Sequence, residues 1–239
     1  MKSQEYYQSK GENLKQFIPE NCKRIIELGC GEGLLSKELK EKGKYVVGIE
    51  IVPDVAKKAE KNLNKVISGD IEKISPDLEK NSYDCLICGD VLEHLHDPLA
   101  VLKKMEKFLT KDAVIIASIP NIQHYTVVVN LLMGNWKYKK AGLLDETHLK
   151  FFTFKSIKEM FQEAGFEIKK VGFTTPITIN NKFPDHEKRL EYWKNEQLDK
   201  KLKEIVSILT DKDENFKNIE MNLPSFAAYQ YLIVAQRIN

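Results

Sequence analysis

The amino-acid sequence predicts an α/β fold in which parallel strands alternate with helices. Short apolar runs, typical of buried strands, recur along the chain and are separated by segments whose apolar residues follow helical spacing. The first such run, Ile25–Leu28, ends abruptly in three glycines at alternate positions, and a helical pattern follows at once. Strands that alternate with helices imply a parallel sheet with right-handed crossovers.

The expected elements follow one another along the chain, and local signals mark the helix boundaries. Gly43 is a suitable left-handed terminator for the first helix, and Pro53 opens the second. Asp97 is a good N-cap with Pro98 at the first helical position, and Thr153 caps a later helix. Strands are expected at 24–28, 45–49, 66–67, 83–88, 113–119, 166–175 and 227–235, and helices at 34–43, 53–63, 98–109 and 153–165.

The length of 239 residues favours a single domain over 1–239 with three additions to the sheet. An amphipathic helix within 1–21 either caps the ligand site or packs on the sheet. Residues 122–150 are too long for a simple α/β connection and mix aromatic with titratable side chains, which suggests a lid insertion. A charged helical insertion is expected at 176–224, before the last strand.

Composition excludes several functional classes. No apolar run approaches the ~18 residues of a membrane span, and no signal peptide is recognisable, so we expect a cytoplasmic protein without a membrane span. The net charge is +2, from 37 basic and 35 acidic residues, and mixed charge signs do not favour nucleic acid. The four cysteines read as buried reduced thiols rather than a zinc site. The oligomeric state stays open.

The glycine turn indicates a nucleotide-like ligand. Glycines leave no Cβ, so a ligand can lie against bare backbone beside the amino end of the next helix. Gly29, Gly31 and Gly33 are spaced two and two, whereas the dinucleotide fingerprint places its third glycine five residues after its first. The spacing therefore argues against nicotinamide and flavin cofactors. A purely structural turn remains the alternative.

Two acids follow the next strands. Glu50 ends the second strand 21 residues after Gly29 (50 minus 29), close to the ~20 expected of a ribose-binding acid. Asp70 stands just beyond the third strand. Because ligands of open α/β sheets bind outside the carboxyl ends of strands, we expect these residues to line one crevice. A solvated loop glutamate is the alternative for Glu50.

Taken together, these motifs resemble those of class I S-adenosylmethionine-dependent methyltransferases. The resemblance covers about residues 20–175 plus the final strand, and it lies in the stretches 26–33, 48–50, 69–71, 84–94 and 118–121. It implies a Rossmann-like, seven-stranded, mostly parallel sheet with an antiparallel last strand and helices on both faces. It also implies S-adenosylmethionine as cofactor, with the glycine turn and Glu27 at the methionine end, Glu50 at the ribose, and Gly89 at the amino acid moiety. The implied cofactor-binding residues are Glu27, Gly29, Cys30, Gly31, Glu50, Ile51, Asp70, Ile71, Gly89 and Asp90.

Residues 91–98 and 147–153 are most similar to the small-molecule O-methyltransferases of quinone biosynthesis and of glycan-associated pathways. The resemblance implies a small-molecule acceptor, with the hydroxyl of a phenol or a sugar as the methylated group. Some quinone-pathway members bind a divalent metal through an acid-x-x-Glu-His cluster, which Asp90, Glu93 and His94 match by type. The first acid is Asp, which shortens its reach, and no metal is assigned.

Three histidines are candidates for the catalytic base, because a neutral imidazole can accept the proton of a hydroxyl at cellular pH. His94 lies just beyond the fourth strand, His148 lies in the expected lid beside two acids, and His124 follows the fifth strand. Each could instead make a structural hydrogen bond. An S-adenosylmethionine-binding module without catalysis is the alternative function.

Overall fold

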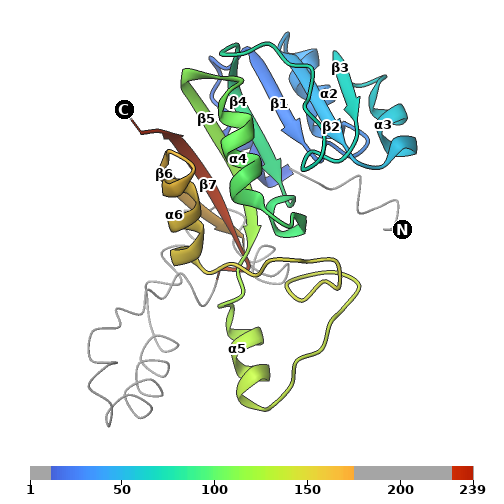
Figure 1. The fold of residues 1–239 in the computed structure, drawn as a ribbon. Coiled ribbons are helices and arrows are strands. Elements are labelled where there is room, and N and C mark those ends of the chain that lie inside the picture. The colour runs from blue at the N-terminus through green and yellow to red at the C-terminus, as the bar shows by residue number, and fades with distance from the viewer. Residues whose placement is uncertain (1–11, 175–227, 239) are drawn as a thin grey trace.

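The computed structural model describes residues 12–174 and 228–238, and these form one seven-stranded sheet covered by helices (Figure 1). The strand order is β3-β2-β1-β4-β5-β7-β6. Neighbouring strands from β3 to β5 are parallel, and β7 runs antiparallel to both β5 and β6. The expected fold class is thereby confirmed. The strands are β1 (Arg24–Leu28), β2 (Tyr45–Glu50), β3 (Lys65–Ser68), β4 (Tyr83–Gly89), β5 (Leu109–Pro120), β6 (Phe166–Thr174) and β7 (Gln230–Arg237).

The helices begin where the sequence places their caps. Asp97 accepts a hydrogen bond from the backbone N–H of Ala100 at 2.9 Å, and Thr153 forms a reciprocal capping box with Ser156. All four expected helices end earlier than expected, α2 and α6 by two residues and α3 and α4, which end at Ala59 and Glu106, by more. The helical elements are η1 (Glu12–Phe17), α2 (Leu34–Glu41), α3 (Pro53–Ala59), η2 (Leu92–His94), α4 (Pro98–Glu106), α5 (Tyr125–Leu132) and α6 (Phe154–Glu163).

Two apolar cores lie on the two faces of the sheet, because successive strand residues point to opposite sides. On one face Ile26 and Leu86 pack with side chains of α4 and α6. On the other face Ile25 and Ile87 pack with side chains of η1, α2 and the end of α3. The helices therefore cover both faces, as expected.

The amino-terminal segment forms a short 3-10 helix in its described part. Leu14 and Phe17 of η1 are buried in the second core, so this part packs on the sheet. Residues 1–11, and the helical insertion expected at 176–224, lie outside the described residues. None of the helices in the described ranges has the length and apolar character that a membrane crossing needs. All four cysteines are buried free thiols.

The lid segment, residues 122–150, leaves the sheet after β5 and returns before α6. Its two ends are held together, since Ile122 N–H donates to the Phe152 carbonyl at 3.0 Å and Asn121 pairs with Phe152 in an isolated bridge. Helix α5 extends away from the sheet (Figure 1). The path of the segment brings its second half back over the ends of β4 and β5.

Candidate active site

The turn after β1 requires glycine for two reasons. Gly29 and Gly33 have φ values of +60° and +77°, in the left-handed region that side chains disfavour. A Cβ on Gly29 would lie 2.7 Å from Val91 Cγ2, and one on Gly33 would lie 2.1 Å from Leu63 Cδ1. The turn therefore combines strained backbone with close packing, and it presents bare backbone at the sheet edge.

The carboxyl ends of β1, β2 and β3 lie next to one another at this turn. Gly31 N–H donates to Glu50 Oε2 at 3.0 Å, and Gly69 N–H donates to the Glu50 carbonyl at 2.9 Å. Glu50 is only 4% exposed, and its Oε1 accepts from Val52 N–H at 3.0 Å. The carboxylate is thus already positioned beside the glycine turn.

The remaining residues expected on the cofactor side fall around this point. Glu27 is buried behind the turn and accepts a hydrogen bond from the Ser36 hydroxyl, while Cys30 is buried beneath the turn. Ile51 is exposed directly after Glu50, and Ile71 packs into the core. Of these four residues Ile51 alone is exposed, whereas Glu27, Cys30 and Ile71 are buried within the protein.

Asp70 stands at the end of β3 as a charged carboxylate. The Lys73 ammonium, 2.9 Å away, holds the pKa of Asp70 below its usual value, and the Glu72 N–H bond to Oδ1 acts in the same direction. The side chain is mostly covered but reaches solvent. An acceptor for hydrogen bonds is therefore available at this edge.

Asp90, directly after Gly89 of β4, is fixed by two residues that the motifs did not identify as partners. Its φ is +48°, and its Oδ1 accepts from the Ser118 hydroxyl at 2.9 Å and from Gln230 Nε2 at 2.6 Å. Gln230 opens β7. An antiparallel strand begins where its parallel neighbours end, so the predicted antiparallel last strand already places its first residues at the site.

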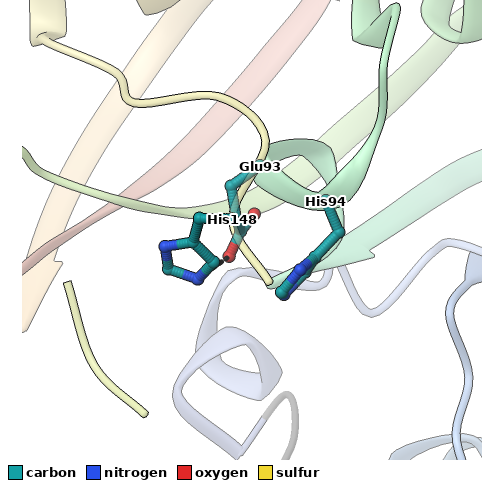
Figure 2. Close-up of side chains that lie close together, drawn as sticks. All are labelled: Glu93, His94 and His148. Atoms are coloured by element: carbon teal, nitrogen blue, oxygen red, sulfur yellow. Dashed lines mark ion pairs between the residues drawn. The ribbon is translucent and has the colours of Figure 1, made fainter. Parts of the chain in front are cut away.

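Glu93, His94 and His148 come together beside Asp90 (Figure 2). The His94 and His148 rings are 4.9 Å apart between centroids, and His148 Nε2 lies 4.0 Å from Glu93 Oε1. The Glu93 side chain is 1% exposed and that of His148 is 6% exposed. Two of the three candidate histidines thus share one buried carboxylate.

Backbone hydrogen bonds fix this juxtaposition across a long sequence separation. The Glu93 carbonyl accepts from the N–H groups of Leu149 and Lys150 at 2.8 and 3.0 Å. His94 Nδ1 lies 3.0 Å from the Thr147 carbonyl. The last residues of the lid segment are therefore tied to η2, and His148 is held beside Glu93.

The same contacts select the tautomer of each ring. A carbonyl oxygen only accepts, so His94 Nδ1 beside the Thr147 carbonyl carries a hydrogen, and so does His148 Nδ1, 3.3 Å from the Leu143 carbonyl. In the neutral rings the lone pair then resides on Nε2. Both histidines offer Nε2 as a base or a metal ligand.

These side chains line a cavity of about 200 Å³ that runs from Asp90 to the lid. It includes Asp90, Glu93, His94, Asp145, His148 and Gln230. His124 does not belong to the described lining. It is 1% exposed, it caps α5 by accepting from Thr126 N–H, and burial lowers its pKa to about 4. The structure therefore brings together His94 and His148 but not His124.

Glu93, His94 and His148 form a group that could hold a divalent metal, and this group differs from the Asp90, Glu93 and His94 cluster that the sequence matches by type without assigning a metal. Asp90 is bonded to Ser118 and Gln230, and His148 takes the third place beside Glu93 and His94. The three ligand atoms lie within 4.8 Å of one another. Two imidazoles and one carboxylate are a donor set that transition metals use, so the residues fit such an ion.

Comparison with known proteins agrees with the geometry. A methyltransferase domain family matches residues 3–171. Ubiquinone biosynthesis O-methyltransferases from Hydrogenovibrio crunogenus and Aeromonas salmonicida are 26% and 22% identical over 66% and 67% of this chain, and 68% and 70% of their own length.

Solved structures share the fold. A SAM-dependent methyltransferase from Archaeoglobus fulgidus superposes with a TM-score of 0.60 at 19% identity, over 94% of this chain and 91% of the other. An S-adenosylmethionine-dependent methyltransferase from Mesorhizobium loti gives a TM-score of 0.59 at 16% identity, over 94% and 96%. The chain belongs to the methyltransferase domain family and is an S-adenosylmethionine-dependent methyltransferase.

Proposed function

We propose that this methyltransferase transfers the methyl group to a hydroxyl oxygen of a phenol or a sugar, with His148 as the base. One observation carries the proposal, namely the single cavity that joins Asp90, at the expected cofactor side, to His94 and His148. The relatives named O-methyltransferases support an oxygen acceptor.

The reaction places limited demands on the protein. The acceptor oxygen forms a bond to the methyl carbon while the carbon–sulfur bond breaks. The electron pair of the broken bond stays on sulfur and neutralises the sulfonium. Alignment of the two reactants supplies most of the rate, because no protein nucleophile takes part. The hydroxyl must still lose its proton, and a phenol with a pKa of ~10 needs modest help.

His148 is the preferred base because of its fixed tautomer and its carboxylate neighbour. Its Nε2 has the lone pair that accepts the acceptor proton, and the Leu143 carbonyl holds the ring by Nδ1. Glu93, 4.0 Å away, stabilises the imidazolium that forms. His94 provides a second polar contact in the cavity. A divalent cation held by Glu93, His94 and His148 would occupy the lone pair of His148 Nε2, so it would replace the imidazole base by lowering the pKa of a coordinated hydroxyl.

On the cofactor side, the proposed contacts follow the resemblance. Glu50 accepts both ribose hydroxyls, and Asp70, Ile51 and Ile71 surround the adenine. The glycine turn and Gly89 approach the methionine moiety. A cytoplasmic location is also proposed, since buried free thiols are typical of reducing compartments.

The test is methyl transfer from isotopically labelled S-adenosylmethionine to a panel of phenols and sugars, followed by mass spectrometry. We expect His148→Ala to lower kcat by about 10²–10⁴ and to leave the Kd of the donor unchanged. His96→Ala is the matched control, because this exposed histidine lies outside the described lining of the cavity. Wild-type turnover in His148→Ala, or no methylated product in the whole panel, contradicts the proposal.

A further inference from the structure

A second cavity adjoins the first beneath the lid. It measures about 180 Å³, and the two cavities share the wall formed by Ala141, Gly142, Leu143 and Tyr229. The wall is tightly packed, since a Cβ on Gly142 would lie 2.6 Å from the Tyr229 hydroxyl oxygen. The two cavities therefore adjoin along this four-residue wall, and a ligand that occupied both would pass over it.

The two cavities carry opposite charges. Asp90, Glu93 and Asp145 line the first, whereas Lys137 and Lys139 line the second, which has no acidic side chain among its described lining residues. The structure records no carboxylate paired with Lys137 or Lys139 within the described parts of the chain. The nearby Lys140, by contrast, is paired with Glu146 at 2.6 Å. Two ammonium groups are thus available to a ligand.

Size and charge together specify the shape of that ligand. A cavity of about 150 Å³ accommodates a benzene ring, so each of the two cavities holds one ring or a group of similar size. An anionic group near the acids of the first cavity would be repelled, whereas near the lysines it would be attracted. The charge pattern therefore favours one orientation of an acidic acceptor.

We infer, building on the proposed function, that the acceptor is a hydroxylated ring bearing an anionic substituent, and that Lys137 and Lys139 bind this anion. The hydroxyl then faces His148 in the first cavity, and the carboxylate or phosphate occupies the second. The lid segment in this way selects the acceptor by charge and also orients it.

Binding measurements test the inference without requiring turnover. The full chain is loaded with S-adenosylhomocysteine, and calorimetry gives the Kd of 3,4-dihydroxybenzoate, of 3,4-dihydroxybenzylphosphonate and of the neutral 3,4-dihydroxybenzamide. We expect both anions to bind at least about tenfold more tightly than the amide at low salt, because two ammonium groups contact the anion. The double variant Lys137→Gln/Lys139→Gln removes that preference and leaves the amide Kd unchanged.

Lys140→Gln is the matched control, because it removes one charge from the same segment outside the described lining. Its preference for anions should equal that of the wild type. Equal affinity of acid and amide for the wild type, binding of neither anion, or the same loss in Lys140→Gln each overturns the inference. If the amide is methylated as fast as the acid, the proposed function still holds. If no hydroxyl compound is methylated, the proposed function is refuted, while the binding measurements still decide the inference.

Discussion

Replacement of Glu50 by Gln tests the cofactor side of the site most directly. Both carboxylate oxygens of Glu50 are already held at 3.0 Å by the N–H groups of Gly31 and Val52, so the side chain needs no rearrangement to accept a ribose diol. The Gln amide keeps one oxygen and turns the other into a donor. The NH2 group of the glutamine would then face a backbone N–H, which is also a donor, and it could not accept a hydrogen bond from a ribose hydroxyl.

The expected loss follows from the bonds that change. A hydrogen bond to a charged group contributes roughly 1.5–3 kcal/mol, and one ribose bond is lost while the other is weakened, which gives about 2–4 kcal/mol in total. The Kd of S-adenosylhomocysteine should then rise by about 30- to 700-fold. The backbone N–H left without its acceptor lowers the free energy of unfolding by about 1–3 kcal/mol, so the variant is less stable.

Isothermal titration calorimetry with S-adenosylhomocysteine is the assay, on variants whose circular dichroism matches that of the wild type. Glu32→Gln is the matched control, because Glu32 lies in the same turn and its carboxylate pairs at 2.8 Å with the exposed Lys58 ammonium. The reasoning fails if Glu50→Gln binds as tightly as the wild type, or if Glu32→Gln weakens binding equally.

Three further predictions concern stability and positioning. Gly33→Ala should lower the free energy of unfolding by at least about 2 kcal/mol in urea titrations, because φ is +77° and the new methyl meets Leu63; unchanged stability would contradict the strained turn. Burial lowers the pKa of His124 to about 4. The contribution of the neutral His124 ring to the free energy of unfolding is therefore complete above pH 6.5 and is lost as the pH falls toward 4. Between pH 7.5 and 4.5 the free energy of unfolding of the wild type should fall by about 2–3 kcal/mol more than that of His124→Asn. Parallel profiles of unfolding free energy against pH would refute this. Gln230→Leu should reduce kcat about tenfold with little loss of stability, because Asp90 loses a 2.6 Å bond but keeps Ser118; an unchanged kcat would remove Gln230 from the site.

The contact between the glycine turn and Glu50 could be anticipated because its determinants are local in the sequence. The glycine turn, the spacing of about twenty residues and the acids after the second and third strands can all be recognised in the sequence, and parallel pairing brings the carboxyl ends of strands together. Gly31 and Glu50, placed on different strands by these patterns, form a direct hydrogen bond in the structure. The rule that neighbouring parallel strands have their carboxyl ends at the same edge of a sheet was enough to predict that these two residues lie close together.

The acceptor side was less accessible to prediction, because long-range backbone bonds define it. Glu93 and His148 lie close together because the N–H groups of Leu149 and Lys150 donate to the Glu93 carbonyl. No periodic pattern in the sequence of the lid segment predicts these hydrogen bonds. The second cavity likewise depends on a turn in the lid near Gly142 that packs against Tyr229. Sequence reasoning could name the titratable residues of the lid but not their partners.

The contrast between His94 and His124 shows that closeness to a strand end in the sequence does not decide whether a histidine can act as a base. Both histidines closely follow a parallel strand, and both met the same criterion for a catalytic base. His124 precedes a helix, so its Nδ1 accepts from Thr126 N–H and the ring is buried as a cap. His94 ends the short η2 instead, where the Thr147 carbonyl accepts from Nδ1–H and the residue lines the cavity. The backbone group that faces Nδ1, an N–H donor for His124 and a carbonyl acceptor for His94, rather than the position along the strand, decides which ring keeps a lone pair on Nε2.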